Sequence, residues 1–254
     1  MLATTAHGSP TARPPLIILH GLFGSARNWG AIARGLASDR LVVTPDMRNH
    51  GESFRAPSQS YREMAGDVAE LAASLAPARP DVLGHSMGGK AAMVLALTRP
   101  DLVGRLIVAD IAPVAYAHSH AGLIRAMQGL DLAGVTRRSE ADRRLAATVP
   151  DPATRAFLLQ SLDLASDPPR WRLNLPVLLG EMHRITGWPA VSGRFESPAL
   201  FLSGERSDYV RPEHRDPILA LFPQARFEVL AGAGHWLHAD RPREFEAAVR
   251  AFRG

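Results

Sequence analysis

Residues 84–88, with the sequence GHSMG, carry the clearest chemical signal in the chain because they place a serine between glycines in a G-x-S-x-G pattern. An apolar run ends at Leu83, and a helix-like run covers residues 90–98. A serine in such a strand-to-helix turn presents its hydroxyl outward, while the N–H groups that open the helix converge where an oxyanion would form. The pattern predicts a nucleophile elbow with Ser86 as the nucleophile, rather than an incidental serine in a glycine-rich turn.

This nucleophile needs a general base, which in such a sheet follows the last strand, close to the C-terminus. His235 follows an apolar stretch at residues 226–230 and a glycine-rich run, and it precedes a helical segment at residues 242–252. Of the ten histidines, His235 is the one whose chain order and loop position fit, and the neighbouring His238 is not favoured. We expect His235 to accept the proton of the Ser86 hydroxyl.

Two aspartates compete for the third role, which is to orient the imidazole and stabilise the imidazolium. Asp110 closes a strand-like apolar run, and Asp208 lies in the loop after a strand at residues 198–203. The usual acid follows a G-x-x-D pattern, and counting from Gly204 that position is Ser207, so Asp208 is one residue late. We favour Asp110 as the acid and keep Asp208 as the alternative.

A tetrahedral intermediate needs two N–H donors for its oxyanion. Met87 follows the nucleophile and supplies the first. The second should come from residues 20–25 (HGLFGS), which follow a buried-strand run at residues 16–19. We expect Leu22 to be that donor and Phe23 to be a wall of the acyl pocket. The same glycine-rich loop could cradle a phosphate, but no Gly-Lys-Ser/Thr follows it.

The polar segment at residues 46–53 (DMRNHGES) follows another strand-like run. Such a polar turn usually braces a neighbouring loop through side-chain hydrogen bonds. We expect it to support the loop beneath the oxyanion segment rather than to take part in the chemistry.

The elements that must position these residues alternate along the chain. Strand-like runs lie at residues 16–19, 41–44, 81–84, 106–110, 199–203 and 227–230, with helical stretches between them. Short, continuous apolar strands are typical of a mainly parallel sheet covered by helices on both faces. The segment before residue 16 leaves room for one extra strand at most.

From residue 112 to residue 196 the pattern changes to helix-like segments broken by prolines, with no convincing strand. An insertion at this point would lie over the elbow as a helical cap, on a core made of residues 1–111 and 197–254. Its aromatic residues and histidines are candidates for the substrate pocket unless they pack the cap onto the core; they are Tyr116, His118, His120, Trp171, His183 and Trp188. His118 and His120 have no third ligand at useful spacing, so no metal site is expected.

Composition narrows the class further. The 254 residues are 46% hydrophobic, which allows a substantial core in one domain, and no 18-residue apolar run or secretory leader is visible. The absence of cysteine excludes disulfides and a cysteine nucleophile and suits a cytoplasmic protein. The net charge is +4, but Lys90 is the single lysine and the arginines are interleaved with 25 acidic residues. We therefore expect no nucleic-acid partner and interpret the arginine pairs at 137–138 and 143–144 as solvated, with attraction of anionic substrates as the alternative.

Five motifs in this order resemble the α/β-hydrolase superfamily, and most closely the small bacterial carboxylesterases and thioesterases related to mitochondrial α/β-hydrolase-domain esterases. The motifs occupy residues 20–29, 45–53, 84–90, 110–113 and 232–236, and the resemblance covers residues 16–253. It implies an α/β-hydrolase fold whose helical cap is inserted between the sixth and seventh strands. The acid in this subgroup resembles the aspartate of an Asp-Ile-x-Pro segment, which matches Asp110.

These observations favour a serine hydrolase that cleaves short- to medium-chain acyl esters or thioesters through an acyl-enzyme, with a small-molecule substrate and no cofactor or metal. Relatives that open epoxides or cleave carbon–halogen bonds carry an aspartate at the elbow, so Ser86 argues against them. Carbon–carbon bond hydrolysis, lactone hydrolysis and cofactor-free perhydrolysis use the same machinery and stay open. A catalytically silent binding protein is the alternative from a different class.

Overall fold

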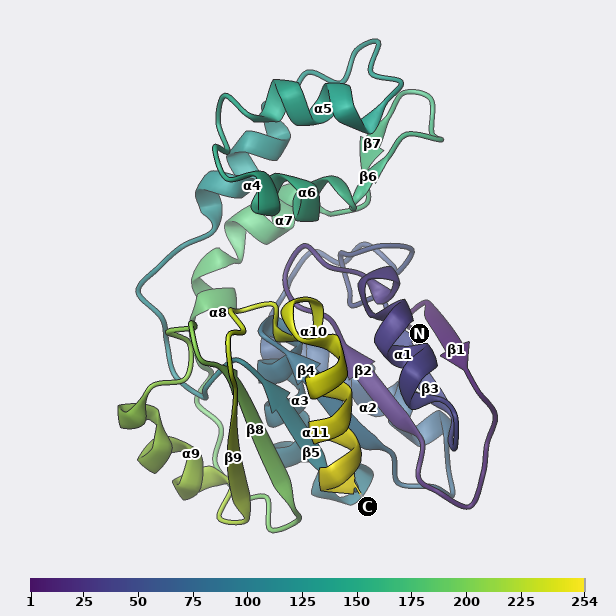
Figure 1. The fold of residues 1–254 in the computed structure, drawn as a ribbon, viewed down its shortest axis with the longest axis vertical. Coiled ribbons are helices and arrows are strands. Elements are labelled where there is room, and N and C mark those ends of the chain that lie inside the picture. Colours follow the sequence, from purple (N-terminus) through teal and green to yellow (C-terminus); the bar gives the residue numbers. More distant parts are fainter. Residues whose placement is uncertain (254) are drawn as a thin grey trace.

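The computed structural model describes residues 1–253, which fold around a seven-stranded sheet with the order β1-β3-β2-β4-β5-β8-β9 (Figure 1). Neighbouring strands pair in parallel except β1 and β3, which are antiparallel. The strands are β1 (Thr4–His7), β2 (Leu16–Leu19), β3 (Val42–Pro45), β4 (Asp81–His85), β5 (Leu106–Ala109), β8 (Ala199–Gly204) and β9 (Ala225–Leu230). The mainly parallel sheet and the one additional strand at the N-terminus are confirmed.

Helices cover both faces of the sheet, as the continuous apolar strands predict. Along β2, Ile17 and Leu19 contribute to a core on one face, and Leu16 and Ile18 contribute to a second core on the other. The first face carries α2 (Tyr61–Ser74) and α3 (Met87–Thr98), and the second carries α1 (Gly30–Leu36) and α11 (Pro242–Arg253). The remaining helices of this body are α9 (Arg215–Leu221), α10 (Leu237–Asp240) and the 3-10 turns η1 (Ala26–Trp29), η2 (Pro100–Leu102) and η3 (Pro212–His214).

Local sequence explains where the helices near the site begin. Ser60 caps α2 through a reciprocal arrangement in which its hydroxyl accepts the Glu63 N–H and the Glu63 carboxylate accepts the Ser60 N–H.

Residues 87–97 of α3 are all buried, because this helix packs between the sheet and α2. A helix buried on every side shows no amphipathic pattern and reads as one apolar run.

Most of the insertion between β5 and β8 forms a separate layer beyond one end of the sheet, at the top of Figure 1, and its last helix runs back to the body. The insertion comprises α4 (Ala121–Gln128), α5 (Arg138–Leu145), α6 (Pro152–Leu159), β6 (Leu162–Asp163), β7 (Arg170–Trp171), α7 (Leu175–Gly180) and α8 (Met182–Thr186). The expectation of a segment without strands is wrong, because β6 and β7 form a small antiparallel hairpin. Two residues per strand are too few to show an alternating pattern.

The position of the insertion in the strand count also differs from the expectation. It lies between the fifth and sixth strands of the large sheet along the chain, not between the sixth and seventh. In the large sheet, β1 alone precedes β2 along the chain. Among residues 1–253, no helix is long and apolar enough to span a membrane.

Candidate active site

Ser86 lies at the junction of β4 and α3 with φ 53° and ψ −119°, a left-handed conformation that is strained for a residue with a side chain. Glycines are required on both sides because the chain passes very close to itself. A Cβ at position 84 would lie 2.3 Å from the Gly88 carbonyl oxygen, and a Cβ at position 88 would lie 2.6 Å from the His20 carbonyl oxygen. This geometry is the one expected of a nucleophile elbow.

His235 has a buried carboxylate as its partner. Its Nδ1 lies 2.7 Å from Asp110 Oδ2, and Asp110 is fully buried directly after β5. The other carboxylate oxygen, Oδ1, accepts the Gly204 N–H at 3.1 Å, and the Ser207 hydroxyl donates to Oδ2. Hydrogen bonds to both of its oxygens fix the orientation of this buried carboxylate. The arrangement is thus able to hold one tautomer of the imidazole.

The alternative acid lies elsewhere. Asp208 is exposed, and its backbone carbonyl accepts a hydrogen bond from Arg211 at 3.1 Å. The residue before it, Ser207, occupies the position that the G-x-x-D pattern assigns to the acid, and it turns its hydroxyl toward Asp110. A shift of one residue in this loop therefore points the Asp208 side chain toward solvent. Of the two candidates, the structure brings Asp110 to His235.

Two aromatic rings, those of Tyr209 and His85, contact the imidazole of His235. The Tyr209 ring stacks on it with centroids 4.0 Å apart and an interplanar angle of 19°, and the His85 ring lies at 4.7 Å. His85 Nε2 also donates to the His235 carbonyl oxygen at 2.8 Å. Burial, and secondarily the nearby His235, holds the pKa of His85 well below its usual range, so this ring stays neutral.

Sequence reasoning did not single out Ser207 or Tyr209 as parts of the site. The only signal was their place in the loop after β8, beside the rejected Asp208. Burial raises the pKa of Tyr209 to about 12, so its hydroxyl also stays protonated near neutral pH.

The loop at residues 20–25 packs directly on the elbow, since a Cβ at position 21 would lie 3.2 Å from Ser86 Cβ. Within this loop, the Phe23 N–H donates to His50 Nε2 at 3.2 Å and is therefore already used. Leu22 precedes it and faces the same cavity as Ser86. Met87 opens α3, where the N–H groups of the first turn have no acceptor within the helix. The assignment of these two N–H groups as oxyanion donors stays a prediction.

The segment at residues 46–53 braces this loop as expected. Besides the bond from Phe23 to His50, the Ala26 N–H donates to Asp46 Oδ1 at 2.7 Å and the Met47 N–H donates to His20 Nε2 at 2.9 Å. Burial lowers the pKa of His50 to about 3. The ring therefore stays neutral and keeps an acceptor nitrogen toward the loop.

A cavity of about 850 Å³ opens beside Ser86 and His235. The core contributes Leu22, Phe23 and Trp236 to its walls, and the insertion contributes apolar residues mainly from α6 and the turn before it. Phe157 of α6 faces Trp236 with ring centroids 5.3 Å apart. A cavity of this size with mostly apolar walls is typical of sites for small ligands.

Phe23 and His120 line this cavity, but the other candidates, Tyr116, His118, Trp171, His183 and Trp188, are not among the lining residues of the described chain. Tyr116 donates its hydroxyl to the Tyr209 carbonyl oxygen at 2.7 Å, and Trp171 donates to the Met127 carbonyl oxygen at 2.9 Å. His183 is exposed on α8, and Trp188 packs against the core. The sequence identifies large side chains, but the packing of short helices decides which face they take.

Phe157 and Trp236, which were not among the candidates, also line the cavity. Trp236 follows the proposed base directly, which is a signal that the sequence offered. Burial, with His118 nearby as a smaller cause, lowers the pKa of His120 to about 4, so this ring adds a neutral polar group to the cavity wall.

A serine at a strained strand-to-helix turn, with a histidine–carboxylate pair beside it on a mainly parallel sheet, defines the class of α/β hydrolases. Comparison with known proteins agrees: the family model described as alpha/beta hydrolase fold matches residues 14–242. The chain therefore belongs to the α/β-hydrolase family and is a hydrolase.

Several relatives resemble almost the whole chain. An sn-1-specific diacylglycerol lipase, ABHD11 of Mus musculus, is 40% identical over 94% of this chain and 80% of its own length. Esterase YbfF of Escherichia coli (strain K12) is 38% identical over 94% of this chain and 91% of its own. A solved structure titled as a marine microorganism esterase is 36% identical, with a TM-score of 0.93 and coverage of 99% of this chain and 100% of that one.

Proposed function

We propose that the protein is a serine hydrolase of short- to medium-chain acyl esters or thioesters. The observation that carries the proposal is the 2.7 Å contact between His235 Nδ1 and Asp110 Oδ2 beside a serine with φ 53° at the elbow. When Nδ1–H is donated to the carboxylate, Nε2 is the basic nitrogen that remains for the Ser86 hydroxyl. The names of the relatives, esterase and diacylglycerol lipase, support acyl esters as the substrate class.

In the proposed reaction, Ser86 Oγ attacks the acyl carbon while His235 Nε2 accepts the hydroxyl proton. The N–H groups of Leu22 and Met87 stabilise the oxyanion of the tetrahedral intermediate. Collapse of the intermediate expels the alcohol or thiol, which takes its proton from His235 and leaves an acyl group on Ser86. A water molecule, deprotonated by His235, then releases the carboxylic acid and restores the serine.

The cavity supports an apolar acyl group as the substrate moiety beside Ser86. Its volume of about 850 Å³ exceeds what a small acyl chain needs, so part of the leaving group also fits. We further propose that residues 112–196 act as the cap of this site and that residues 1–111 and 197–254 form the core. This division is supported by the lining, which takes Phe23 and Trp236 from one part and His120 and Phe157 from the other.

Labelling by a fluorophosphonate probe tests the nucleophile. We expect the purified protein to be labelled once and Ser86→Ala to lose both labelling and ester turnover, by at least about a thousandfold, because oxyanion binding alone remains. Ser74→Ala, which changes an exposed serine at the end of α2, is the matched control and should behave as the parent protein. Persistent labelling or near-normal turnover in Ser86→Ala would refute the mechanism.

A further inference from the structure

The segment at residues 46–59, called here the bracing loop, lies between the oxyanion loop at residues 20–25 and the inserted cap. It connects β3 to α2 and contains two left-handed residues, Asn49 with φ 64° and Gly51 with φ 55°. A Cβ at position 51 would lie 2.0 Å from the Asp46 carboxylate, so the loop can fold this tightly only with glycine there. One side of the loop contacts the oxyanion loop, and the other side contacts the cap.

On one side, the bracing loop holds the oxyanion loop through His50. The ring is fully buried, and its Nδ1 donates to the Arg48 carbonyl oxygen at 2.9 Å. Its Nε2 is therefore the acceptor for the Phe23 N–H at 3.2 Å. Phe23 has φ 65° and follows Leu22, so this bond fixes the peptide directly after Leu22, next to the peptide that carries the proposed oxyanion donor.

On the other side, the bracing loop is joined to the cap at the start of α7. The Asn174 N–H donates to the Asn49 carbonyl oxygen at 2.9 Å, and Asn174 Nδ2 donates to Asn49 Oδ1 at 2.9 Å. The next pair along, His50 and Leu173, forms an isolated antiparallel bridge. Two consecutive residues of the cap are thus paired with the two residues that precede Gly51.

Asn49 is the junction between the two sides. It is fully buried, and its amide group also donates to the Ser58 carbonyl oxygen at 3.0 Å and to Gln59 Oε1 at 2.9 Å. Its Oδ1 accepts the Ala56 N–H at 2.8 Å in addition to the Asn174 amide. A buried side chain with every polar group paired has one defined position.

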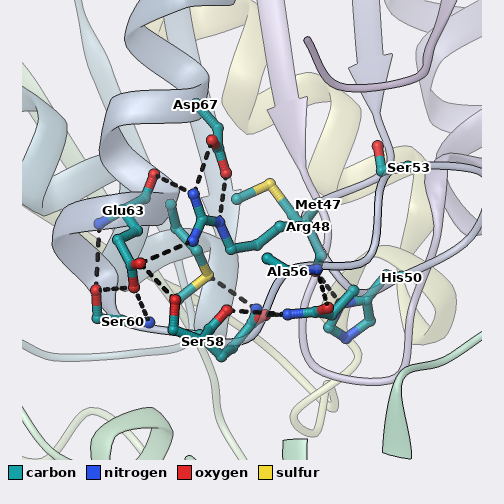
Figure 2. Close-up of polar contacts among 12 residues, drawn as sticks. Met47, Arg48, His50, Ser53, Ala56, Ser58, Ser60, Glu63 and Asp67 are labelled. Carbon is teal, nitrogen blue, oxygen red and sulfur yellow. Dashed lines mark hydrogen bonds and ion pairs between the residues drawn. The ribbon is translucent and has the colours of Figure 1, made fainter. Parts of the chain in front are cut away.

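The rest of the bracing loop is anchored to α2, as Figure 2 shows for Arg48. Arg48 Nε lies 2.6 Å from Asp67 Oδ2, and a second nitrogen lies 3.2 Å from Glu63 Oε1. The cap also contacts the bracing loop through Arg172 on Glu52 and Glu181 on the Gln59 N–H, but Asn49 and His50 are the contact points next to the bond that reaches the oxyanion loop. A contiguous chain of contacts of this kind can carry coupling between two sites.

We propose that Asn174 and Asn49 are positioning residues that couple the seating of the cap to the orientation of the Leu22 N–H. Only a cap seated on the bracing loop then completes the oxyanion site, so closure over substrate and stabilisation of the intermediate occur together. This inference rests on the part of the proposed function that assigns the oxyanion donors.

The test removes one side chain, that of Asn174, from this network of contacts. Asn174→Ala deletes the amide that bonds to Asn49 and Ala56, and it removes no helix cap because the Asn174 side chain makes no capping bond to α7. The matched control is Tyr61→Phe, which deletes another buried hydrogen bond between core and cap, from the Tyr61 hydroxyl to the Ile185 carbonyl oxygen. Both variants are assayed on a short-chain ester and on its thionoester analogue, in which a weakly accepting sulfur replaces the carbonyl oxygen.

Removing one oxyanion donor typically costs about 10² to 10³ in kcat, so a misdirected donor should cost less, about tenfold. For Asn174→Ala we expect kcat on the oxygen ester to fall about tenfold with little change in KM, while the thionoester loses less than about threefold. Tyr61→Phe should keep the preference of the parent protein for the oxygen ester. Equal losses on both substrates, or no loss, in Asn174→Ala would overturn the coupling.

Two further measurements separate the possible failures. If Asn174→Ala does not fold, Asn174→Ser, whose hydroxyl is too short to replace the amide at Asn49, must show the same selective loss. If the parent protein itself has no preference for the oxygen ester, the oxyanion assignment fails and the coupling with it. If that preference and the Ser86→Ala result are as expected but Asn174→Ala resembles Tyr61→Phe, only the coupling is refuted.

Discussion

At the scale of single residues, the two candidate acids differ in burial and in direction. Asp110 is fully buried and contacts His235, whereas Asp208 is exposed. We expect Asp110→Asn to lower kcat about ten-thousandfold near neutral pH, because the amide favours the wrong imidazole tautomer and cannot stabilise the imidazolium. The measurement is ester turnover on protein whose folding is verified by circular dichroism.

Asp208→Asn is the matched control for this prediction. It makes the same chemical change one residue after Ser207, on a side chain that points to solvent, and it should retain at least about a tenth of the activity. If the ranking of the two variants were reversed, the catalytic acid would be Asp208, and comparable losses would mean that the two carboxylates share the role.

Chain order and motif spacing predict Ser86, His235 and Asp110 as one site, and the structure places Ser86 and His235 on the same cavity with Asp110 bonded to His235. Chain order and spacing were not sufficient to choose the acid outright, because a loop can turn a carboxylate toward or away from its partner within one residue. The stacking of Tyr209 on His235 was not predictable for the same reason: it depends on the path of the loop after β8 and not on any local motif.

At the scale of elements, the strands of the large sheet were predictable because each is a short apolar run buried on both faces and bounded by turn residues. The hairpin of β6 and β7 was not, since two-residue strands leave no pattern. Among the cap residues that line the cavity, the sequence singled out His120 but not Phe157. Short helices such as α6 and α8 have no strongly apolar stripe, and tertiary packing decides which side chains reach the cavity.

The cap should set the preferred acyl length through α6. Phe157 packs against Trp236 at the cavity wall, with ring centroids 5.3 Å apart, and Phe157→Ala removes this aromatic contact. Each methylene that gains a place in the cavity is worth about 0.8 kcal/mol, so kcat/KM for longer acyl chains should rise by about threefold to fourfold per added carbon until the new space is filled. A series of p-nitrophenyl esters of graded length measures this profile.

Trp171→Phe is the control for the cap, because it alters a large aromatic residue of the same layer that does not line the cavity within the described chain. It should leave the profile of acyl lengths unchanged. A shifted profile in Trp171→Phe, or an unshifted one in Phe157→Ala, would show that α6 does not form the acyl wall.

At the scale of the whole molecule, Lys90 joins the nucleophile helix to the end of the cap. Its ammonium group donates to the carbonyl oxygens of Thr186 at 3.1 Å and Gly187 at 2.6 Å, and it lies over the Tyr116 ring at 4.7 Å. Lys90 is 1% exposed and is the single lysine of the chain. Burial lowers its pKa to about 7.

The composition allows the effect of Lys90 protonation on stability to be measured with little interference from other side chains. All other basic side chains with a pKa higher than that of histidine are arginines, which stay charged in this range. Cysteine is absent. Burial raises the pKa of all three tyrosines, Tyr61, Tyr116 and Tyr209, so none of them ionises in the folded protein near pH 9. In the unfolded chain the tyrosines, with an ordinary pKa near 10, ionise mainly above pH 9, so between about pH 7.5 and 9 Lys90 is the main side chain whose protonation differs between the folded and unfolded chains.

In that window the unfolded chain, with an ordinary lysine pKa of 10.5, binds one more proton than the folded chain does. The free energy of unfolding should therefore rise with pH, by about 1.4 kcal/mol per unit and about 2 kcal/mol from pH 7.5 to 9, while the cost of the buried charge is fully present below pH 7. Urea unfolding at half-unit steps measures this slope, and Lys90→Met should flatten it and be the more stable protein at pH 7. A flat curve for the parent protein would instead mean that the carbonyl groups of Thr186 and Gly187 compensate the burial and keep Lys90 charged throughout.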